Sequence, residues 1–351
     1  MGGGPFPHSS VCPRGFRPRG SEEPAGTQHP MEEVMKALFD PEKIERDLRI
    51  LEREYSLTET RTVLFNLVIF ANREELAPIE ENLLIPLLGK RAARIIRISL
   101  GHSGETSVSV SARCAPDREE KGVCFQEILI ENGSDDAGVA PGSWSAFLIR
   151  DLPVYVLWHT PLPEADSIGP LSFAREQADK FLLDGEYFLQ KDLPLKDYIQ
   201  RVRKQLIDAG VQVSDFTWER IRPLRIFTAQ VFDQKALMDL LPHVISLEVS
   251  GPSPLSRFYY STWVRCVLEE EGRKLEVVSR QADTVQVVFR FRDTSDPLVW
   301  RVDSEGMGRA FFGTEEVLAR PLKFPSDGAI LLEQVDIPIA DPLYRRVLEG
   351  L

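Results

Sequence analysis

The sequence is poor in the side chains that most often build metal and nucleophilic sites. Its 351 residues include only five histidines and four cysteines. Cys12, Cys114, Cys124 and Cys266 form no CxxC pair, and no HExxH motif occurs. Because structural zinc sites need His and Cys at such close spacings, we expect no metal site in this chain.

The common phosphate-binding and acyl-transfer motifs are missing as well. There is no GxxxxGK[ST] loop, no GxGxxG after an apolar strand, and no GxSxG. These patterns mark phosphate-binding turns and serine nucleophiles. We therefore predict no catalytic residue, no cofactor-binding residue and no cofactor, although a site built from scattered residues stays open as an alternative.

Positive charge and long apolar runs are also scarce. The chain has 42 Lys and Arg against 54 Asp and Glu, a formal net charge of -12. Binding to nucleic acid or to an anionic membrane surface needs a surplus of cations, so we expect neither partner. No run of 18 apolar residues occurs, which predicts no transmembrane helix.

The number of cysteines indicates the cellular compartment. Four cysteines in a long acidic chain without a secretory-signal pattern predict a reducing, cytoplasmic location. Cys114 and Cys124 flank a predicted turn, so they either face each other across a hairpin or are two independent strand residues. A redox role would need a lowered thiol pKa and exposure, which the sequence does not show.

The length predicts about two domains. Residues 1–30 are rich in Gly and Pro, which predicts a disordered tail. We expect an N-terminal α/β domain at 31–160, a Pro-rich linker at 161–170 and a C-terminal α+β domain at 171–351.

The first half alternates apolar strands with helical patterns. Residues 62–71 are almost continuously apolar and β-branched, typical of a strand buried on both faces. Asp40 caps a helix that starts at Pro41, and Asn72 caps another. Further strands are predicted at 94–100, 106–112, 123–131 and 153–158, with a short helix at 144–149. Together they predict an open, Rossmann-like mixed sheet without its glycine-rich turn.

The second half begins with helices and ends in strands. Helices are predicted at 171–181, at 195–207, from Pro223 and at 257–268. Strands are predicted at 244–249, 274–280, 284–292, 298–302 and 308–312, as an antiparallel meander, with a last strand at 329–335 and a final helix at 342–348. This predicts an α+β domain.

Three features could carry chemistry or binding. His159 ends a predicted strand, where open α/β sheets place ligands, so it is either an acid–base residue or a hydrogen-bonded structural one. Arg91 and Arg94 could hold a phosphate or a partner carboxylate, or make ordinary internal ion pairs. Residues 215–225 combine a Trp with several arginines, the residue types enriched at interface hot spots, although a Trp in the core is the alternative.

The sequence resembles the glucose-6-phosphate dehydrogenase assembly protein family, OpcA, in four blocks that keep their order. Thr60-Arg61-Thr62 followed by Asn66-Leu67-Val68 is similar to the family's TR-x-x-x-x-NLVV start. Residues 91–98 are similar to its short Arg-containing strand. Residues 151–158 (DLPVYVLW) are similar to DLPV-x-x-WW, and 215–225 (DFTWERIRPLR) to D-x-x-W-x-R-x-x-P-W-R.

Two positions depart from the family pattern. Leu224 stands where the family usually has a second Trp, and His159 follows a single Trp158. Some members of the family are linked to redox control. This chain lacks an adjacent Cys pair, so the resemblance does not extend to redox sensing.

The resemblance implies a non-catalytic protein of the cytoplasm. It would bind glucose-6-phosphate dehydrogenase, promote its active oligomer or its activation, and support NADPH supply in the oxidative pentose phosphate pathway. The alternative is a sugar-phosphate- or nucleotide-binding enzyme with a site at the strand ends of the first sheet. The candidate partner-binding residues are Arg61, Asn66, Arg91, Arg94, Trp158, Asp215, Trp218, Arg220 and Arg225.

Overall fold

The structure is a computed structural model. It describes residues 35–37, 40–55, 62–102, 107–116, 122–133, 143–164, 169–268 and 274–349. The expected disordered tail at 1–30 and the candidate residue Arg61 lie outside these stretches. In the described part no helix combines the length and the apolar character needed to cross a membrane.

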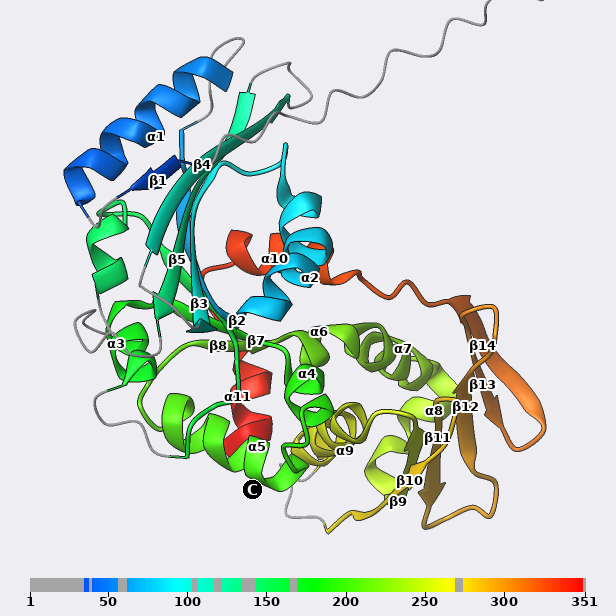
Figure 1. Ribbon diagram of the computed structural model, residues 1–351. Helices are drawn as coiled ribbons and strands as arrows, with labels where there is room; N and C mark the ends of the chain where they lie inside the picture. The colour runs from blue at the N-terminus through cyan, green and yellow to red at the C-terminus, as the bar shows by residue number, and fades with distance from the viewer. Residues whose placement is uncertain are drawn as a thin grey trace, which may run out of the picture. The chain divides into compact units, whose positions relative to one another are not determined.

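A large mixed sheet of eight strands forms the first half of the fold (Figure 1). Its spatial order is β1-β4-β5-β3-β2-β6-β7-β8. The strands are β1 (Met35–Ala37), β2 (Phe65–Asn72), β3 (Ala93–His102), β4 (Ser107–Pro116), β5 (Gly122–Gly133), β6 (Val154–His159), β7 (Lys180–Leu183) and β8 (Val213–Asp215). β5, β3, β2, β6, β7 and β8 run parallel. At one edge β4 pairs antiparallel with β5, and β1 pairs antiparallel with β4.

The six parallel strands follow the order 3-2-1-4-5-6 when they are counted along the chain. This is the order of the doubly wound nucleotide-binding fold. The apolar runs in the sequence correspond to central strands that are covered on both faces. Every residue of β2 from Phe65 to Ala71 is buried, as are β7 and the first five residues of β6. The expected Rossmann-like α/β fold is confirmed.

Helices cover both faces of the large sheet. One face packs on the helical segment 73–87, made of η1 (Arg73–Glu75), α2 (Leu76–Ile79), η2 (Glu80–Leu84) and η3 (Ile85–Leu87), together with α10 (Asp327–Asp336). Figure 1 shows the red α10 beside the cyan α2. The other face packs on α1 (Pro41–Tyr55), η4 (Ser143–Phe147), α3 (Pro170–Gln177), α5 (Leu195–Val202), η5 (Arg203–Ile207) and α11 (Pro342–Glu349).

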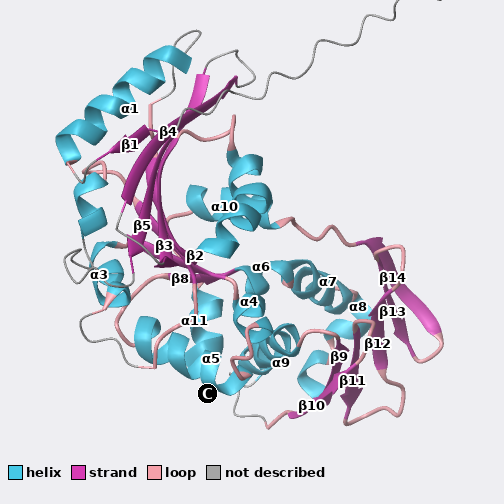
Figure 2. Cartoon of the chain, viewed as in Figure 1, coloured by secondary structure: helices cyan, strands magenta, loops and turns pink. Residues whose placement is uncertain are grey.

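A second sheet of six strands follows in the order β10-β9-β11-β12-β13-β14. Its strands are β9 (Val244–Gly251), β10 (Glu276–Gln281), β11 (Gln286–Phe291), β12 (Leu298–Val302), β13 (Met307–Phe312) and β14 (Glu315–Pro321). β11 to β14 form the expected antiparallel meander, but β10 pairs parallel with β9. The remaining helices are α4 (Gly185–Gln190), α6 (Phe216–Arg220), α7 (Arg222–Phe232), α8 (Lys235–Met238), η6 (Leu241–His243) and α9 (Pro254–Leu268). α7, α8 and α9 lie on one side of this sheet (Figures 1 and 2).

Three expectations need correction. Residues 329–335 form α10 rather than a strand, because Ile330, Leu331 and Val335 share one helical face and Ser326 caps the helix. The predicted helix at 171–181 ends at Gln177, and β7 begins at Lys180. β14 was not predicted, because its sequence is mostly polar and exposed.

The expected linker at 161–170 does not coincide with the end of the large sheet. β7 and β8 lie after it and extend the same sheet, and α10 returns from the far end of the chain to cover that sheet. Gly328 sits so close to the helical segment that a Cβ there would lie 2.5 Å from Pro86. Residues on both sides of 161–170 therefore share one core.

Cys114 and Cys124 lie opposite each other on β4 and β5 and form a disulfide. The hairpin alternative left open by the sequence is therefore the one observed. Cys266 lies on α9 and takes no part in this disulfide.

A buried lysine joins β7 to the end of α10. Lys180 is 0% exposed, and its Nζ donates to Gln334 Oε1 at 2.7 Å and to the carbonyl oxygens of Gln334 (3.1 Å) and Ile337 (2.8 Å). Burial lowers the pKa of Lys180 from 10.5 to about 8. The charge is held by carbonyl dipoles at the carboxyl end of the helix.

We predict that Lys180 makes the free energy of unfolding rise with pH between about 8 and 10.5. In that window the unfolded chain holds the lysine proton and the folded chain releases it, so folding gains as pH rises, by roughly 2–3 kcal/mol. Urea unfolding of the wild type and of Lys180→Met across this range measures the difference. A wild-type advantage that is constant with pH would contradict the prediction.

Candidate functional site at the strand ends

The carboxyl ends of the parallel strands meet at one edge of the large sheet. In open α/β sheets ligands bind at this edge, where the strand order reverses. Here the reversal lies between β2 and β6, which are neighbours although separated in the chain. The residues that follow these strands therefore form the first place to search for a site.

Side chains fill this switch point. The rings of His159 and Tyr187 stack with centroids 3.7 Å apart. His159 Nε2 lies 3.9 Å from Glu75 Oε2, and Lys191 Nζ lies 2.8 Å from Glu75 Oε1. Burial lowers the pKa of His159, and the carboxylates of Asp184 and Glu75 offset part of that shift. His159 is thus held as a stacked, mostly buried ring.

The turn after β2 does not suit a phosphate. A dinucleotide site needs glycines there, so that the backbone and a helix N-terminus can reach the pyrophosphate. This chain instead has Arg73, Glu74 and Glu75, which form a 3-10 turn with two carboxylates. These carboxylates would repel a phosphate placed at the expected position.

Asp215, the last residue of β8, is a buried carboxylate with four hydrogen-bond donors. Its Oδ2 accepts from the hydroxyls of Tyr198 (2.7 Å) and Tyr259 (2.6 Å). Its Oδ1 accepts from the backbone N–H groups of Thr217 (2.7 Å) and Gly185 (3.2 Å). Burial raises the pKa of Asp215, and the two tyrosine hydrogen bonds oppose that shift.

The helix that Asp215 caps, α6, carries Trp218 and Arg220. Arg220 forms a bidentate pair with Asp184, at 2.8 Å for both bonds, and also binds Asp327 at 2.8 Å. Trp218 is 1% exposed, and its Nε1 donates to Asp341 Oδ2 at 2.9 Å.

Two further arginines complete this set. The guanidinium of Arg225 lies 3.6 Å from the Trp218 ring centroid and 3.5 Å from Asp341. Arg222 pairs with Glu333 on α10. The segment 215–225 therefore holds residues 327–341 against the large sheet.

The other candidate arginines also have partners within the chain. Arg91 forms a bidentate pair with Asp336, at 2.8 Å for both bonds. Arg94 is 3% exposed and binds Glu45 and Gln126. The internal ion-pair alternative is therefore the one observed for both arginines.

Asn66 and Trp158 are buried within the large sheet. The Asn66 side chain donates to the carbonyl of Ile149 at 3.0 Å and accepts from its N–H at 2.9 Å. Trp158 is 3% exposed and packs against Phe70. Among the described candidates, Asp215, Trp218, Arg220 and Arg225 lie close together, whereas Asn66, Arg91, Arg94 and Trp158 are spread over the sheet.

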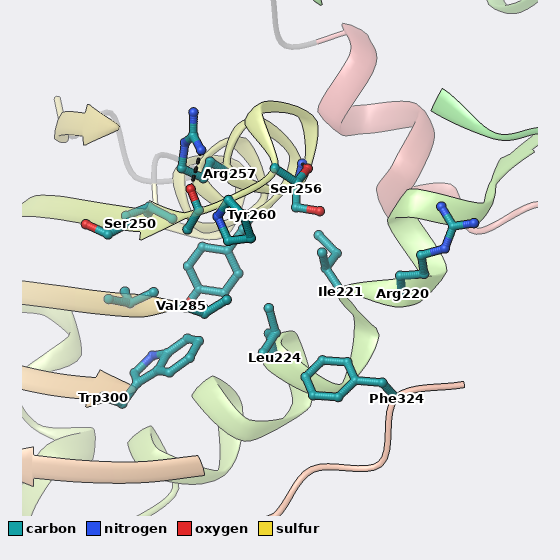
Figure 3. A pocket seen from close by; sticks show the side chains of 15 residues that line it. Arg220, Ile221, Leu224, Ser250, Ser256, Arg257, Tyr260, Val285, Trp300 and Phe324 are labelled. Carbon is teal, nitrogen blue, oxygen red and sulfur yellow. Dashed lines mark hydrogen bonds between the residues drawn. The ribbon is translucent and has the colours of Figure 1, made fainter. Parts of the chain in front are cut away.

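A small cavity lies next to Arg220 (Figure 3). It has a volume of about 200 Å³ and lies between α6, α7, the start of α9 and the second sheet. Its walls are mainly apolar, with Ile221, Leu224, Tyr260 and Trp300 turned toward it. Its described lining includes no carboxylate, imidazole or thiol, so it offers no acid–base pair for catalysis.

Sequence reasoning missed the partners of these residues. Asp184, Asp327 and Asp341 accept hydrogen bonds from Arg220 and Trp218, and the hydroxyls of Tyr198 and Tyr259 donate to Asp215. The partners on α10 and before α11 lie more than 100 residues away in the chain, so no local spacing could reveal them. One local signal was present: an Asp two residues before a backbone N–H at a helix start, as Asp215 is before Thr217, is the pattern of a helix N-cap.

Two family models match the chain in sequence. The first, of the OpcA assembly type, is described as the N-terminal domain of the glucose-6-phosphate dehydrogenase subunit, and it matches residues 87–200. The second is described as the C-terminal domain of the glucose-6-phosphate dehydrogenase subunit, and it matches residues 211–348. No curated protein matches the sequence.

Several solved structures are similar to the fold. One is biliverdin reductase in complex with biliverdin and NADP+ from Synechocystis sp. PCC 6803, with 12% identity and a TM-score of 0.41, covering 81% of this chain and 96% of that one. A second is KijD10, a 3-ketoreductase from Actinomadura kijaniata, with 9% identity and a TM-score of 0.40, covering 81% and 93%. A third is an oxidoreductase from Sinorhizobium meliloti, with 9% identity and a TM-score of 0.41, covering 82% and 96%.

We predict that Asp215→Ala lowers the free energy of unfolding by about 3–5 kcal/mol, because it leaves two hydroxyls and two backbone N–H groups without their acceptor. Asp208→Ala, at an exposed position after η5, is the matched control and should change stability by less than about 0.5 kcal/mol. Denaturant unfolding followed by tryptophan fluorescence measures both. Equal stability of the two variants would show that the Asp215 cluster does not hold the fold.

Proposed function

Because the chain belongs to the glucose-6-phosphate dehydrogenase assembly family, OpcA, we propose that it binds glucose-6-phosphate dehydrogenase and favours the active oligomer of that enzyme. The proposed role is non-catalytic. It would support NADPH production in the oxidative pentose phosphate pathway, in the cytoplasm.

The observation that carries this proposal is the pair of family matches. They cover residues 87–200 and 211–348, which include most of both sheets and the segment 215–225. The four blocks of resemblance fall within the described residues except for the start of the first block. Both matched families are described in terms of the same dehydrogenase.

The strand ends of the large sheet support a non-catalytic role. His159, Tyr187 and Glu75 occupy the switch point where a dinucleotide would lie, and the turn after β2 carries carboxylates instead of glycines. A helper protein needs no such site. It raises activity by binding the active state of its partner more tightly than the other states.

One observation favours an enzyme as the second candidate. A buried His beside Glu75, Tyr187 and Lys191 is a cluster of titratable groups in a place where active sites occur. Under this alternative the chain would bind a sugar phosphate or a nucleotide at the switch point.

Mixing the purified protein with the dehydrogenase from the same organism tests the leading proposal. We expect a complex whose mass exceeds that of either protein in light scattering, together with a higher rate of NADPH formation at limiting substrate. The chain alone should show no turnover, and His159→Gln should leave the activation unchanged.

Two results would overturn the proposal. One is no change in mass and none in activity across effector conditions. The other is turnover of a sugar phosphate by the chain alone that His159→Gln abolishes, which would establish the enzyme alternative.

A further inference from the structure

A groove runs between helix α7 and the extended segment that connects β14 to α10. Figure 1 shows this connection passing beside α7 on its way from the second sheet to the large one. The groove has a volume of about 620 Å³. We call it the α7 groove; its lining residues are Arg222, Pro223, Ile226, Phe227, Gln230 and 320–325.

The charge of the α7 groove is opposite to that of the chain. The chain carries a formal net charge of -12, yet the groove is lined by Arg222, Arg320 and Lys323 and by no carboxylate in the described residues. Arg222 is neutralised by Glu333, but Arg320 donates only to the uncharged Gln230. No carboxylate of the described part pairs with Lys323. Two exposed cations are therefore available to a binding partner.

Apolar side chains lie between these cations. Ile226 is 51% exposed and Phe324 is 48% exposed, although both are large and apolar. Phe324 lines the α7 groove and also the inner cavity of Figure 3, so it borders both spaces. A large apolar residue that remains half exposed beside unpaired cations is typical of a protein-binding patch.

We propose that the α7 groove binds an acidic surface segment of the dehydrogenase that also carries one large apolar side chain. This inference rests on the proposed function. The acidic groups would pair with Arg320 and Lys323, and the apolar side chain would pack between Ile226 and Phe324. A second copy of this chain fits less well, because a symmetric contact through the groove would place its cations against one another.

The experiment measures the affinity of the full-length chain for the dehydrogenase at low and at high salt. Arg320→Glu with Lys323→Glu reverses the charge of the groove and should weaken binding at least about tenfold at low salt. Phe324→Ala should weaken binding by a similar factor at both salt concentrations, because an apolar contact is not screened. Lys196→Glu, on the exposed surface of α5, is the matched control and should change affinity less than about twofold.

The outcomes distinguish a failure of the groove proposal from a failure of the proposed function. If the wild type binds the dehydrogenase and all groove variants bind equally well, the α7 groove is not the contact and the proposed function stands. If the wild type forms a homodimer that Arg320→Glu with Lys323→Glu dissociates, the groove binds a second copy and this inference is overturned. If the wild type does not bind the dehydrogenase, both proposals fail together.

Discussion

The fold depends on a carboxylate buried where several elements meet. Asp215 ends β8, caps α6 and accepts hydrogen bonds from Tyr198 on α5 and Tyr259 on α9. A buried charge is tolerated only when donors surround it, so these elements cannot move apart without exposing an unpaired carboxylate. Gly185 is part of the same constraint: a Cβ there would lie 2.8 Å from Asp215 Oδ2, so the α4 backbone can donate to the carboxylate only without a side chain. The edge of the large sheet and the helices of the second half are thereby fixed to one point.

From that point the arginines hold the end of the chain. Arg220 and Arg222 bind the two ends of α10, and Trp218 with Arg225 binds Asp341 just before α11. These pairs are partly buried, so removing one partner would leave the other charge without its counterion. They direct α10 onto the face that the helical segment 73–87 leaves open, where Gly328 permits close approach to Pro86. The segment 215–225, for which the sequence left an interface and a core role open, thus makes the contacts that return the C-terminal residues to the first sheet.

The sequence predicted the parts of the fold whose signals are local. Apolar runs predicted four of the six parallel strands, namely β2, β3, β5 and β6, and further runs predicted β9 to β13 of the second sheet. β7 lies partly within the predicted helix at 171–181, and β8, which is only three residues long, was not predicted. It predicted His159 at a strand end, but not the Tyr187 ring that stacks on it from α4. Residues 329–335 were interpreted as a strand, because a short apolar run has the same composition in a buried helix and in a strand. The pairing of Arg91 with Asp336 and of Lys180 with the end of α10 was not predictable, since charged residues carry no mark of a partner that lies 150 or more residues away.

The strand order of a nucleotide-binding fold does not by itself make a nucleotide site. The order places two strand ends beside each other, but binding needs glycines that admit a pyrophosphate and a space for the dinucleotide. In this chain Glu74 and Glu75 stand in place of the glycines, and the stacked rings of His159 and Tyr187 lie in the space that a dinucleotide would need. Elsewhere on the surface, the exposed cations Arg320 and Lys323 and the half-exposed Phe324 place positive and apolar groups together on a chain whose net charge is negative.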